Sequence, residues 1–419
     1  MGASTMENQA RRRGEFLLKK GRMSAAESRI GNIKILVVAG ESSGDLYAAD
    51  LVSELKKRMP QDQFDFFGCG GERMQRAGVR TVVDMHRLAV LGPLEVLSHL
   101  THLFSALRQL EKEVKAICPQ LAILVDFPDF NLRLAKKLSA LNIPIIYLIS
   151  PQIWAWRSGR VKLIKKIVKR MLVILPFERD FYCKRGVEVE YIGHPLIDRV
   201  SITISKAAFF GQCHLNPAIP TISLLPGSRR KEISYNLPIL LRTARLLNWN
   251  RPIQFLLPLA SEMHRHLANN ILKEEVGMLP LEIIIHDTYN AVGHSDLAVV
   301  ASGTATLETA LLGTPLITVF KISNLTWIIG QYLVQVPFYS LVNLIAGKRI
   351  VPELFQSNFS EDTLYHEITE FLDNKAHLKR VKIELAEVRK KLGEGGAMAR
   401  AAEQVMIVLN APARLAELN

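Results

Sequence analysis

Cysteine is scarce in this sequence, and neither cysteine nor histidine stands in a metal-binding pattern. The four cysteines among 419 residues, Cys69, Cys118, Cys183 and Cys213, lie far apart with no C-x-x-C pair. This spacing argues against a disulfide framework and is typical of buried thiols in a reducing compartment. The eleven histidines contain no H-E-x-x-H motif. The sequence therefore predicts no metal site and no cofactor.

The N-terminus lacks the apolar segment of a signal peptide. Residues 1–32 are polar and basic, so we expect a disordered extension, with a transit peptide as the alternative. Two apolar stretches, 88–107 and 322–347, are long enough to span a bilayer, but glycine, proline or polar residues interrupt both. The first suggests an interfacial or lipid-binding surface and the second core or dimer packing. Ordinary core helices remain an alternative for each.

Acidic residues are outnumbered, and the formal net charge is +13, of which residues 1–34 contribute +5. A basic body indicates an anionic partner. We find no nucleic-acid motif in which basic and aromatic residues interleave, so phosphates or a membrane are favoured over nucleic acid. The stretch 157–170 holds seven basic residues and no acid, which suits phosphates, lipid headgroups or a plain solvated helix face.

Short apolar runs of strand length alternate with helix-patterned stretches along the chain. They fall at residues 34–39, 64–68, 121–125, 144–149 and 171–175, and again at 221–225, 253–257, 282–285, 297–301 and 315–319. Runs without polar alternation predict parallel sheets buried on both faces. The fold class is therefore α/β of GT-B type, with two Rossmann-like domains facing a cleft. The expected parts are an extension (1–32), an N-terminal domain (33–199), a C-terminal domain (200–360) and a helical tail (361–419).

The first motif joins the first predicted strand to its helix. It is a turn of small residues after Gly40, and it can present backbone N–H groups to an anion. It is not the G-x-G-x-x-G fingerprint, which disfavours a dehydrogenase. A plain tight turn with a serine cap is the alternative. The predicted acceptor-binding residues here are Ser42, Ser43 and Gly44.

Two further motifs follow strands of the first domain. Asp126 comes directly after the run 121–125, where ligands of open α/β sheets bind, so it can act as a general base toward a hydroxyl group. Asp129 or Asn131 is expected to cap the next helix. Trp154 and Trp156 can line a sugar or acyl pocket, although tryptophans at this spacing are more often core residues.

Two loops of the second domain are suited to phosphate. Gly227 and Ser228 allow close backbone approach, and Arg229 can bind a phosphate bidentately. The segment 302–308 opens a helix with small residues, so its N-terminus can hold a diphosphate while Glu308 reaches ribose hydroxyls. The residues of this segment predicted to bind a nucleoside diphosphate, which the resemblance given below makes UDP, are Ser302, Gly303, Thr304, Ala305 and Glu308.

Nine segments in one order resemble lipid-A-disaccharide synthase, a family of inverting, metal-independent GT-B glycosyltransferases. They are GESSGD, LGPLEVL, DFPDFN, SPQIWAWR, LPFERDFY, GHPLID, LLPGSR, ASGTATLE and SLVNLIAGKRIVPEL. The resemblance implies transfer of 2,3-diacylglucosamine from UDP to 2,3-diacylglucosamine 1-phosphate, giving a β-1,6-linked disaccharide 1-phosphate of lipid A biosynthesis. It makes Asp126 the base, with Glu41, Asp45 and Asp129 as secondary candidates.

The same resemblance implies a cytoplasmic enzyme, peripheral on the inner membrane, that binds a UDP-sugar donor and a lipid monosaccharide acceptor and no nucleic acid. It adds Asn343 to the UDP site, in a homodimer whose exchanged C-terminal parts would let Asn343 serve the neighbour. The implied membrane-contact residues are Leu91, Leu94, Leu97, Leu100, Leu103 and Phe104.

One departure from the family pattern is that Lys348 and then Arg349 stand where the family has a single arginine. The sequence therefore leaves open whether this position contacts a phosphate bidentately, as an arginine can. Alternatives are another UDP-sugar GT-B enzyme, such as a lipid II-type transferase or an epimerase, and a non-catalytic membrane-binding protein.

Overall fold

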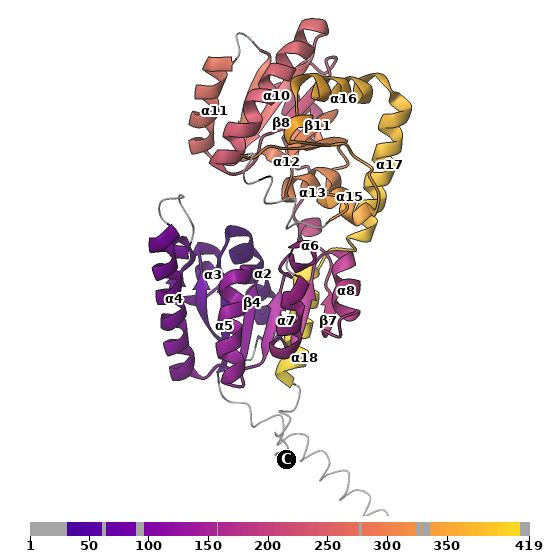
Figure 1. Ribbon diagram of the computed structural model, residues 1–419. Helices are drawn as coiled ribbons and strands as arrows, with labels where there is room; N and C mark the ends of the chain where they lie inside the picture. Colours follow the sequence, from indigo (N-terminus) through magenta and orange to yellow (C-terminus); the bar gives the residue numbers. More distant parts are fainter. Residues whose placement is uncertain are drawn as a thin grey trace, which may run out of the picture. The chain divides into compact units, whose positions relative to one another are not determined.

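The computed structural model describes residues 32–60, 64–88, 96–156, 158–275, 279–323, 327 and 336–410. The described chain forms two parallel β-sheets with helices packed on them (Figure 1). It divides into two compact units, one reaching Ile146 and resuming at Ala402, the other Tyr147–Ala401. This division falls within the first sheet, so the domain boundaries given above stay a prediction.

The first sheet has seven strands in the order β3-β2-β1-β4-β5-β6-β7. They are β1 (Ile33–Ala39), β2 (Phe64–Gly70), β3 (Val79–Asp84), β4 (Leu121–Val125), β5 (Ile145–Leu148), β6 (Arg170–Val173) and β7 (Val189–Tyr191). β1 pairs in parallel with both β2 and β4, and β4 is buried along its whole length. Strand order reverses direction between β1 and β4, which makes their carboxyl ends a topological switch point.

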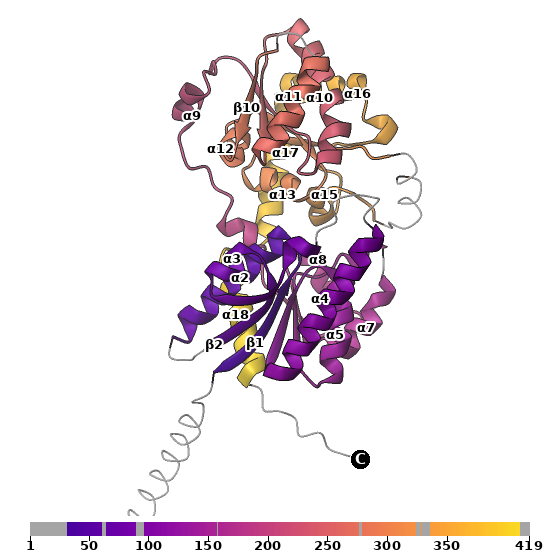
Figure 2. The ribbon, with the colours of Figure 1, turned by 90° about the vertical axis from the view of Figure 1, so that its left-hand side faces the viewer.

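Helices of this unit lie on both faces of the sheet. In Figure 2, α2 (Ser42–Arg58) and α3 (Glu72–Arg76) lie on one face, and α4 (Val96–Ile117) and α5 (Pro128–Ala140) on the other. The end of α18 (Ala397–Asn410) returns to this unit, where Glu403 forms an ion pair of 3.1 Å with Arg58 on α2. The helices after β5 are α6 (Ile153–Trp156), α7 (Val161–Ile167) and α8 (Pro176–Cys183).

The second sheet has six strands in the order β10-β9-β8-β11-β12-β13. They are β8 (Thr221–Leu225), β9 (Gln254–Leu259), β10 (Leu281–Ile285), β11 (Leu297–Ala301), β12 (Leu316–Phe320) and β13 (Glu353–Phe355). β8 pairs in parallel with β9 and with β11, so the switch point here lies between β8 and β11.

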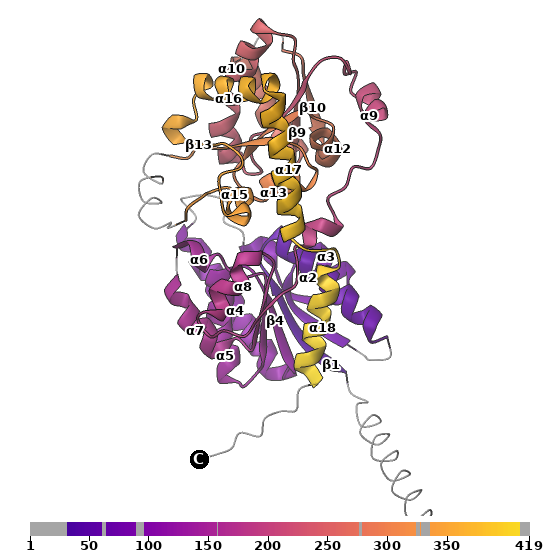
Figure 3. The same cartoon turned by 90° about the vertical axis from the view of Figure 1, so that its right-hand side faces the viewer.

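The helices of this part are numbered on from α9. They are α9 (Lys206–Gln212), α10 (Arg230–Asn250), α11 (Glu262–Glu275), α12 (Thr288–Gly293), α13 (Thr304–Leu311), α15 (Leu341–Ala346), α16 (Glu361–Asp373) and α17 (Lys375–Lys391). Helix α17 runs along α13 and α15 (Figure 3). α9 follows the expected domain boundary at residue 199, and its Phe209 and Phe210 are buried against Leu256 on β9.

All ten predicted strands are present, and no end differs from the prediction by more than two residues. Three strands were not predicted: β3, β7 and β13. Each lies at an edge of its sheet, and none is buried throughout, so the sequence carries no continuous apolar run there. The expectation of buried thiols was wrong for two cysteines, because Cys118 and Cys183 are exposed and only Cys69 is fully buried.

Candidate active site

The loops after β1 and β4 lie side by side at the switch point of the first sheet. Paired register brings the last residues of both strands, Ala39 and Val125, opposite each other. The loop after β1 begins with Gly40 and Glu41, and the loop after β4 begins with Asp126. A Cβ atom on Gly40 would lie 2.3 Å from the ring of Phe127, so only glycine allows this contact between the two loops. The sequence-predicted base therefore lies in the crevice position of an open α/β sheet.

Asp126 and Phe127 both have left-handed backbone conformations, with φ of 45° and 48°. Such a conformation costs a non-glycine residue roughly 1–2 kcal/mol, so two in succession require surrounding structure to hold them. Asn131 does so from the first turn of α5, where its side-chain Nδ2 donates to the carbonyls of Val125 (3.1 Å) and Asp126 (2.8 Å). Phe127 is the N-cap of α5 and makes no side-chain cap hydrogen bond. The expected cap by Asn131 was wrong, because its Oδ1 accepts no hydrogen bond within the described structure, and a cap by Asp129 stays a prediction.

The environment of Asp126 favours its protonated form more than water does. Burial raises the pKa of Asp126 to about 6, and the neighbouring Glu41 carboxylate acts in the same direction. A hydrogen bond from the Phe127 backbone opposes the shift. A carboxylate with a pKa close to neutral can accept a proton and release it again near physiological pH.

The other residues predicted for this loop divide into exposed and structural ones. Ser42 and Ser43 are exposed at the start of α2, and neither caps it, because the N-cap is Glu41 without a side-chain hydrogen bond. Gly44 is buried, and a Cβ there would lie 3.3 Å from that of Ala39. Gly44 therefore allows α2 to pack closely on the strand.

The two secondary candidates after Glu41 differ in exposure. Asp45 is buried and accepts hydrogen bonds from the backbone N–H groups of Gly71 (2.6 Å), Arg73 (3.1 Å) and Met74 (3.3 Å). It therefore holds the start of α3. Asp129 is exposed in the first turn of α5.

Trp154 is held by a buried carboxylate. Its Nε1 donates to Glu178 Oε1 at 3.0 Å, and its ring packs edge-on against Phe177. Glu178 is only 1% exposed, and burial raises its pKa to about 7, with opposing hydrogen bonds from Leu175 and Trp154. Trp154 is thus half-buried and fixed in orientation. The side chain of Trp156 lies outside the described residues.

The second sheet carries a hollow of about 330 Å³ at its own switch point. It is lined by Leu225, Gly227, Ser228, Arg229, Glu232, Pro258, Ala260, Thr288, Ala301, Ser302, Gly303, Thr304, Ala305 and Glu308, and we call it the first hollow. These residues follow the carboxyl ends of β8, β9, β10 and β11. All predicted UDP-binding residues except Asn343 line it, so the structure brings the two predicted phosphate loops together.

The loop after β8 is shaped by Glu232, which the sequence reasoning had not singled out. Its Oε2 accepts from the backbone N–H groups of Ser228 (3.0 Å) and Arg229 (3.2 Å). The Arg229 side chain is 76% exposed, and its guanidinium makes only a long contact, of 3.4 Å, with the Glu232 carboxylate. The loop is therefore ordered from within, while its cation remains available to an anion.

The loop after β11 presents the N-terminus of α13 to the first hollow. Gly303 is the N-cap, with φ of 152° and ψ of −162°, a backbone region essentially restricted to glycine. No side chain caps the helix. The first N–H groups of a helix lack intrahelical partners, so those of Thr304 and Ala305 can bind an anion.

A second hollow of about 470 Å³ adjoins the first and shares Ala260, Thr288 and Glu308 with it. Its remaining lining residues are Ser201, Thr203, Leu259, His286, Asp287, Tyr289 and Asn290. Glu308 thus lies at the border of the two hollows. Burial raises its pKa, and a hydrogen bond of 3.0 Å from Tyr289 Oη opposes the shift.

Tyr289 and its neighbours were missed at the sequence level. They directly follow β10, and a residue after a parallel strand is a site candidate on that ground alone. Without a glycine-serine turn, however, residues 286–290 gave no further signal.

Asn343 lies in α15, outside both hollows, and its side chain is fully buried against the loop that follows this helix. Its Oδ1 accepts from the backbone of Ile350 (2.8 Å) and Val351 (3.1 Å), and its Nδ2 donates to the Val351 carbonyl and to Glu353. All of its polar atoms therefore serve the loop itself. A role in UDP binding stays a prediction.

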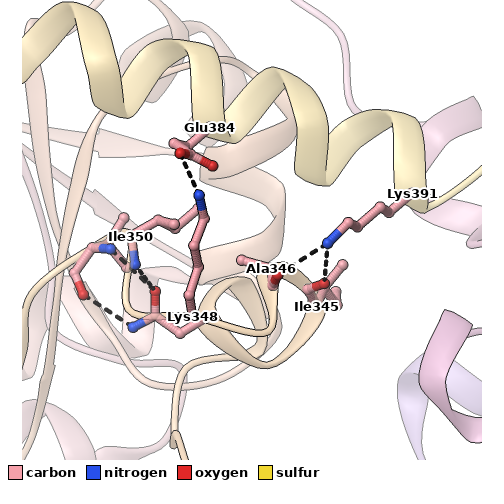
Figure 4. Close-up of polar contacts among 8 residues, drawn as sticks. Ile345, Ala346, Lys348, Ile350, Glu384 and Lys391 are labelled. Carbon is pink, nitrogen blue, oxygen red and sulfur yellow. Dashed lines mark hydrogen bonds and ion pairs between the residues drawn. The ribbon is translucent and has the colours of Figure 1, made fainter.

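Helix α17 holds the same loop from outside (Figure 4). Lys348 forms an ion pair of 2.6 Å with Glu384, and Lys391 donates to the carbonyls of Ile345 and Ala346. Arg349 is exposed, as Lys348 is, but no ion pair of Arg349 is present among the described residues. Of the two cations that replace the family arginine, Lys348 is therefore the one already engaged.

The predicted membrane-contact residues are only partly described. Leu91 and Leu94 lie outside the described residues, as do the side chains of Leu97 and Leu100 on α4. Leu103 is half-buried, and Phe104 is 50% exposed with the Arg133 guanidinium 5.9 Å from its ring centre. Within the described ranges, no helix is both long and apolar enough to cross a membrane.

The chain matches known proteins along most of its length. A family model described as lipid-A-disaccharide synthetase matches residues 35–407. A lipid-A-disaccharide synthase of Solibacter usitatus is 42% identical over 377 residues, which cover 90% of this chain and 97% of that protein. One of Myxococcus xanthus is 43% identical with the same coverage. The chain belongs to the lipid-A-disaccharide synthase family.

Membership makes this chain a glycosyltransferase of lipid A biosynthesis, as the motifs predicted. Solved structures confirm the GT-B fold. The UDP-GlcNAc 2-epimerase of Neisseria meningitidis, in a structure bound to UDP-GlcNAc, matches with a TM-score of 0.62 at 12% identity, over 89% of this chain and all of that one. MurG of Acinetobacter baumannii matches with a TM-score of 0.57 at 12% identity, over 90% of this chain and all of that one.

Proposed function

We propose that this lipid-A-disaccharide synthase family member transfers 2,3-diacylglucosamine from UDP to the 6-hydroxyl of 2,3-diacylglucosamine 1-phosphate. UDP leaves and a β-1,6-linked disaccharide 1-phosphate forms. The observation that carries the donor half is the convergence of Arg229 and the α13 N-terminus on one hollow. Two relatives of the same fold support a UDP-sugar donor, since one was solved with UDP-GlcNAc and another with UDP.

In this proposal the diphosphate lies in the first hollow. The backbone N–H groups of Thr304 and Ala305 and the Arg229 guanidinium stabilise the charge that develops on UDP as it leaves. Glu308 accepts hydrogen bonds from the ribose hydroxyls at the border, and the uracil extends into the second hollow. Helix dipole and guanidinium together supply the charge stabilisation that a metal ion supplies in other transferases.

The acceptor half rests on Asp126. Its carboxylate takes the proton of the acceptor 6-hydroxyl while that oxygen bonds to the anomeric carbon of the donor. The bond between this carbon and the UDP oxygen breaks on the opposite side, which inverts the configuration. A positioned general base of this kind contributes roughly 10²–10⁴-fold to the rate.

We also propose that the chain is a cytoplasmic homodimer. It binds the inner membrane peripherally, because its substrates are diacylated. Two surfaces are candidates for this contact. One is the α4 surface with Leu103 and Phe104. The other is α7 with its flanks, where Lys162, Lys165, Lys166 and Lys169 are exposed.

UDP release with diacylated and with unacylated UDP-glucosamine tests the reaction. We expect release only with the diacylated donor and only when the diacylated 1-phosphate acceptor is present. Release with the unacylated donor would indicate another UDP-sugar transferase. Interconversion of the donor sugar without any acceptor would indicate an epimerase, and no turnover with UDP bound would indicate a binding protein.

A further inference from the structure

Asn131 is the residue through which α5 holds the loop of the proposed base. Three consecutive carbonyls, those of Val125, Asp126 and Phe127, accept hydrogen bonds from this one residue. The side-chain Nδ2 binds the first two at 3.1 and 2.8 Å, and the backbone N–H binds the third at 3.0 Å. The whole path of the chain from the end of β4 into α5 is therefore fixed by one amide side chain and its own peptide.

The Asn131 side chain has no exposed surface, and its Oδ1 is buried without a hydrogen-bond partner in the described structure. A buried, unsatisfied acceptor is unfavourable, and an apolar side chain of similar size at this position would avoid it. What such a replacement would lose is the pair of bonds from Nδ2. Asparagine is therefore favourable at this position only if the two hydrogen bonds from Nδ2 outweigh the cost of burying the unsatisfied Oδ1.

The two bonds hold a conformation that the residues themselves disfavour. Asp126 and Phe127 are left-handed in succession, and the Phe127 ring covers Gly40 on the neighbouring loop. If the Nδ2 bonds were lost, both residues could relax toward ordinary φ values. The direction of the Asp126 side chain is set by that backbone, so relaxation would turn its carboxylate away.

We propose that Asn131 is a positioning residue for the transfer reaction, whose buried amide fixes the left-handed Asp126–Phe127 pair and thereby aims the Asp126 carboxylate at the acceptor hydroxyl. This inference rests on the proposed role of Asp126. It assigns Asn131 an effect on turnover that is transmitted through Asp126 and leaves the donor site unchanged.

The test is a double-mutant cycle on the full-length chain with Asn131→Leu, Asp126→Asn and the double variant. Leucine has the same number and branching of side-chain heavy atoms as asparagine but cannot donate a hydrogen bond. We expect Asn131→Leu to lower kcat by about a hundredfold, as small misplacements of reacting groups do, with the Kd of UDP within about twofold of the parent. In the Asp126→Asn background the same change should alter kcat by less than about threefold, since the carboxylate it positions is gone.

Leu138→Ala is the matched control, because Leu138 is buried on the same helix at 1% exposure and does not contact the loop carbonyls through any recorded bond. It should lower the melting temperature and leave kcat per folded molecule within about threefold. If Asn131→Leu does not fold, Asn131→Ser keeps one donor and takes its place in the cycle, with a smaller loss of kcat expected.

Two results would overturn the inference. One is a kcat for Asn131→Leu within about threefold of the parent. The other is a double variant whose loss of kcat equals the product of the losses in the two single variants, which would mean that Asn131 acts independently of the carboxylate. Failure of the proposed function looks different, because Asp126→Asn would then itself retain near-parental turnover.

Discussion

Tyr289 Oη donates a hydrogen bond of 3.0 Å to Glu308 Oε1 and so joins helix α12 to helix α13. The bond crosses the border between the two hollows, whose linings share Glu308. Burial raises the pKa of Glu308 and this bond lowers it, so Tyr289 favours the ionised carboxylate and orients it. In the proposed donor site, that carboxylate accepts the ribose hydroxyls.

Tyr289→Phe removes the bond and leaves the ring in place. The pKa of Glu308 should then rise further, because the hydrogen bond that opposes the shift is lost. We expect UDP affinity to fall several-fold, and to fall more as the pH is lowered, because the higher pKa favours the protonated carboxyl group. Calorimetry with UDP and with inorganic diphosphate provides the check. Diphosphate has no ribose, so its affinity should stay within twofold; an equal loss for both ligands would contradict the assignment.

Arg229→Ala should weaken UDP binding by about ten- to a hundredfold, the range for a charge-assisted hydrogen bond. Arg229→Lys should fall in between, because an ammonium cannot bind a phosphate bidentately. Arg230→Ala is the matched control. Arg230 is the next residue and is also exposed, but it does not line the first hollow. Equal UDP affinity in the Arg229 and Arg230 variants would mean that the loop after β8 is only a turn.

The sequence predicted most of this site because parallel sheets place their functional loops by topology. Asp126, Arg229 and Glu308 each follow a buried apolar strand, and such strands are legible in sequence. Asn131 shows what sequence does not convey. Its place in the first turn of α5 suggested a cap, whereas the folded chain turns its amide back onto the carbonyls of the preceding loop. In the sequence Asp45 likewise resembles a free carboxylate. In the folded chain it accepts a hydrogen bond from the backbone of Gly71 at the start of α3, a helix distant in sequence.

Asp126→Asn should lower kcat by about 10²–10⁴-fold while UDP binding stays within twofold, because the donor residues belong to the other sheet. The parent's kcat should rise with pH through about 6, where the base ionises, and then level off. The acidic limb should be absent from the residual activity of the variant. Near-parental turnover would exclude Asp126 as the base and direct attention to Glu41.

The raised pKa of Asp126 also has a consequence for stability. In the unfolded chain this carboxyl ionises near 3.8, and in the folded chain near 6. Ionisation therefore disfavours the folded state. The penalty is absent below about 3.8, develops as pH rises toward 6 and is complete above it, with an order of 1–3 kcal/mol. Asp126→Asn should accordingly melt at a higher temperature than the parent at pH 8 and at nearly the same temperature at pH 4. A lower melting point at pH 8 would contradict this sign.

Replacing Leu100, Leu103 and Phe104 together with serine should reduce co-sedimentation with vesicles that contain anionic phospholipid. The Phe104 side chain is 50% exposed, and serine removes the apolar area that it would insert into the bilayer interface. Ile383→Ser on α17 is the control, because Ile383 is also an exposed aliphatic residue, at 57%. Full binding by the triple variant would place the contact elsewhere.

In that case glutamine at Lys162, Lys165, Lys166 and Lys169 should abolish binding at low salt, since an electrostatic contact weakens with each cation removed.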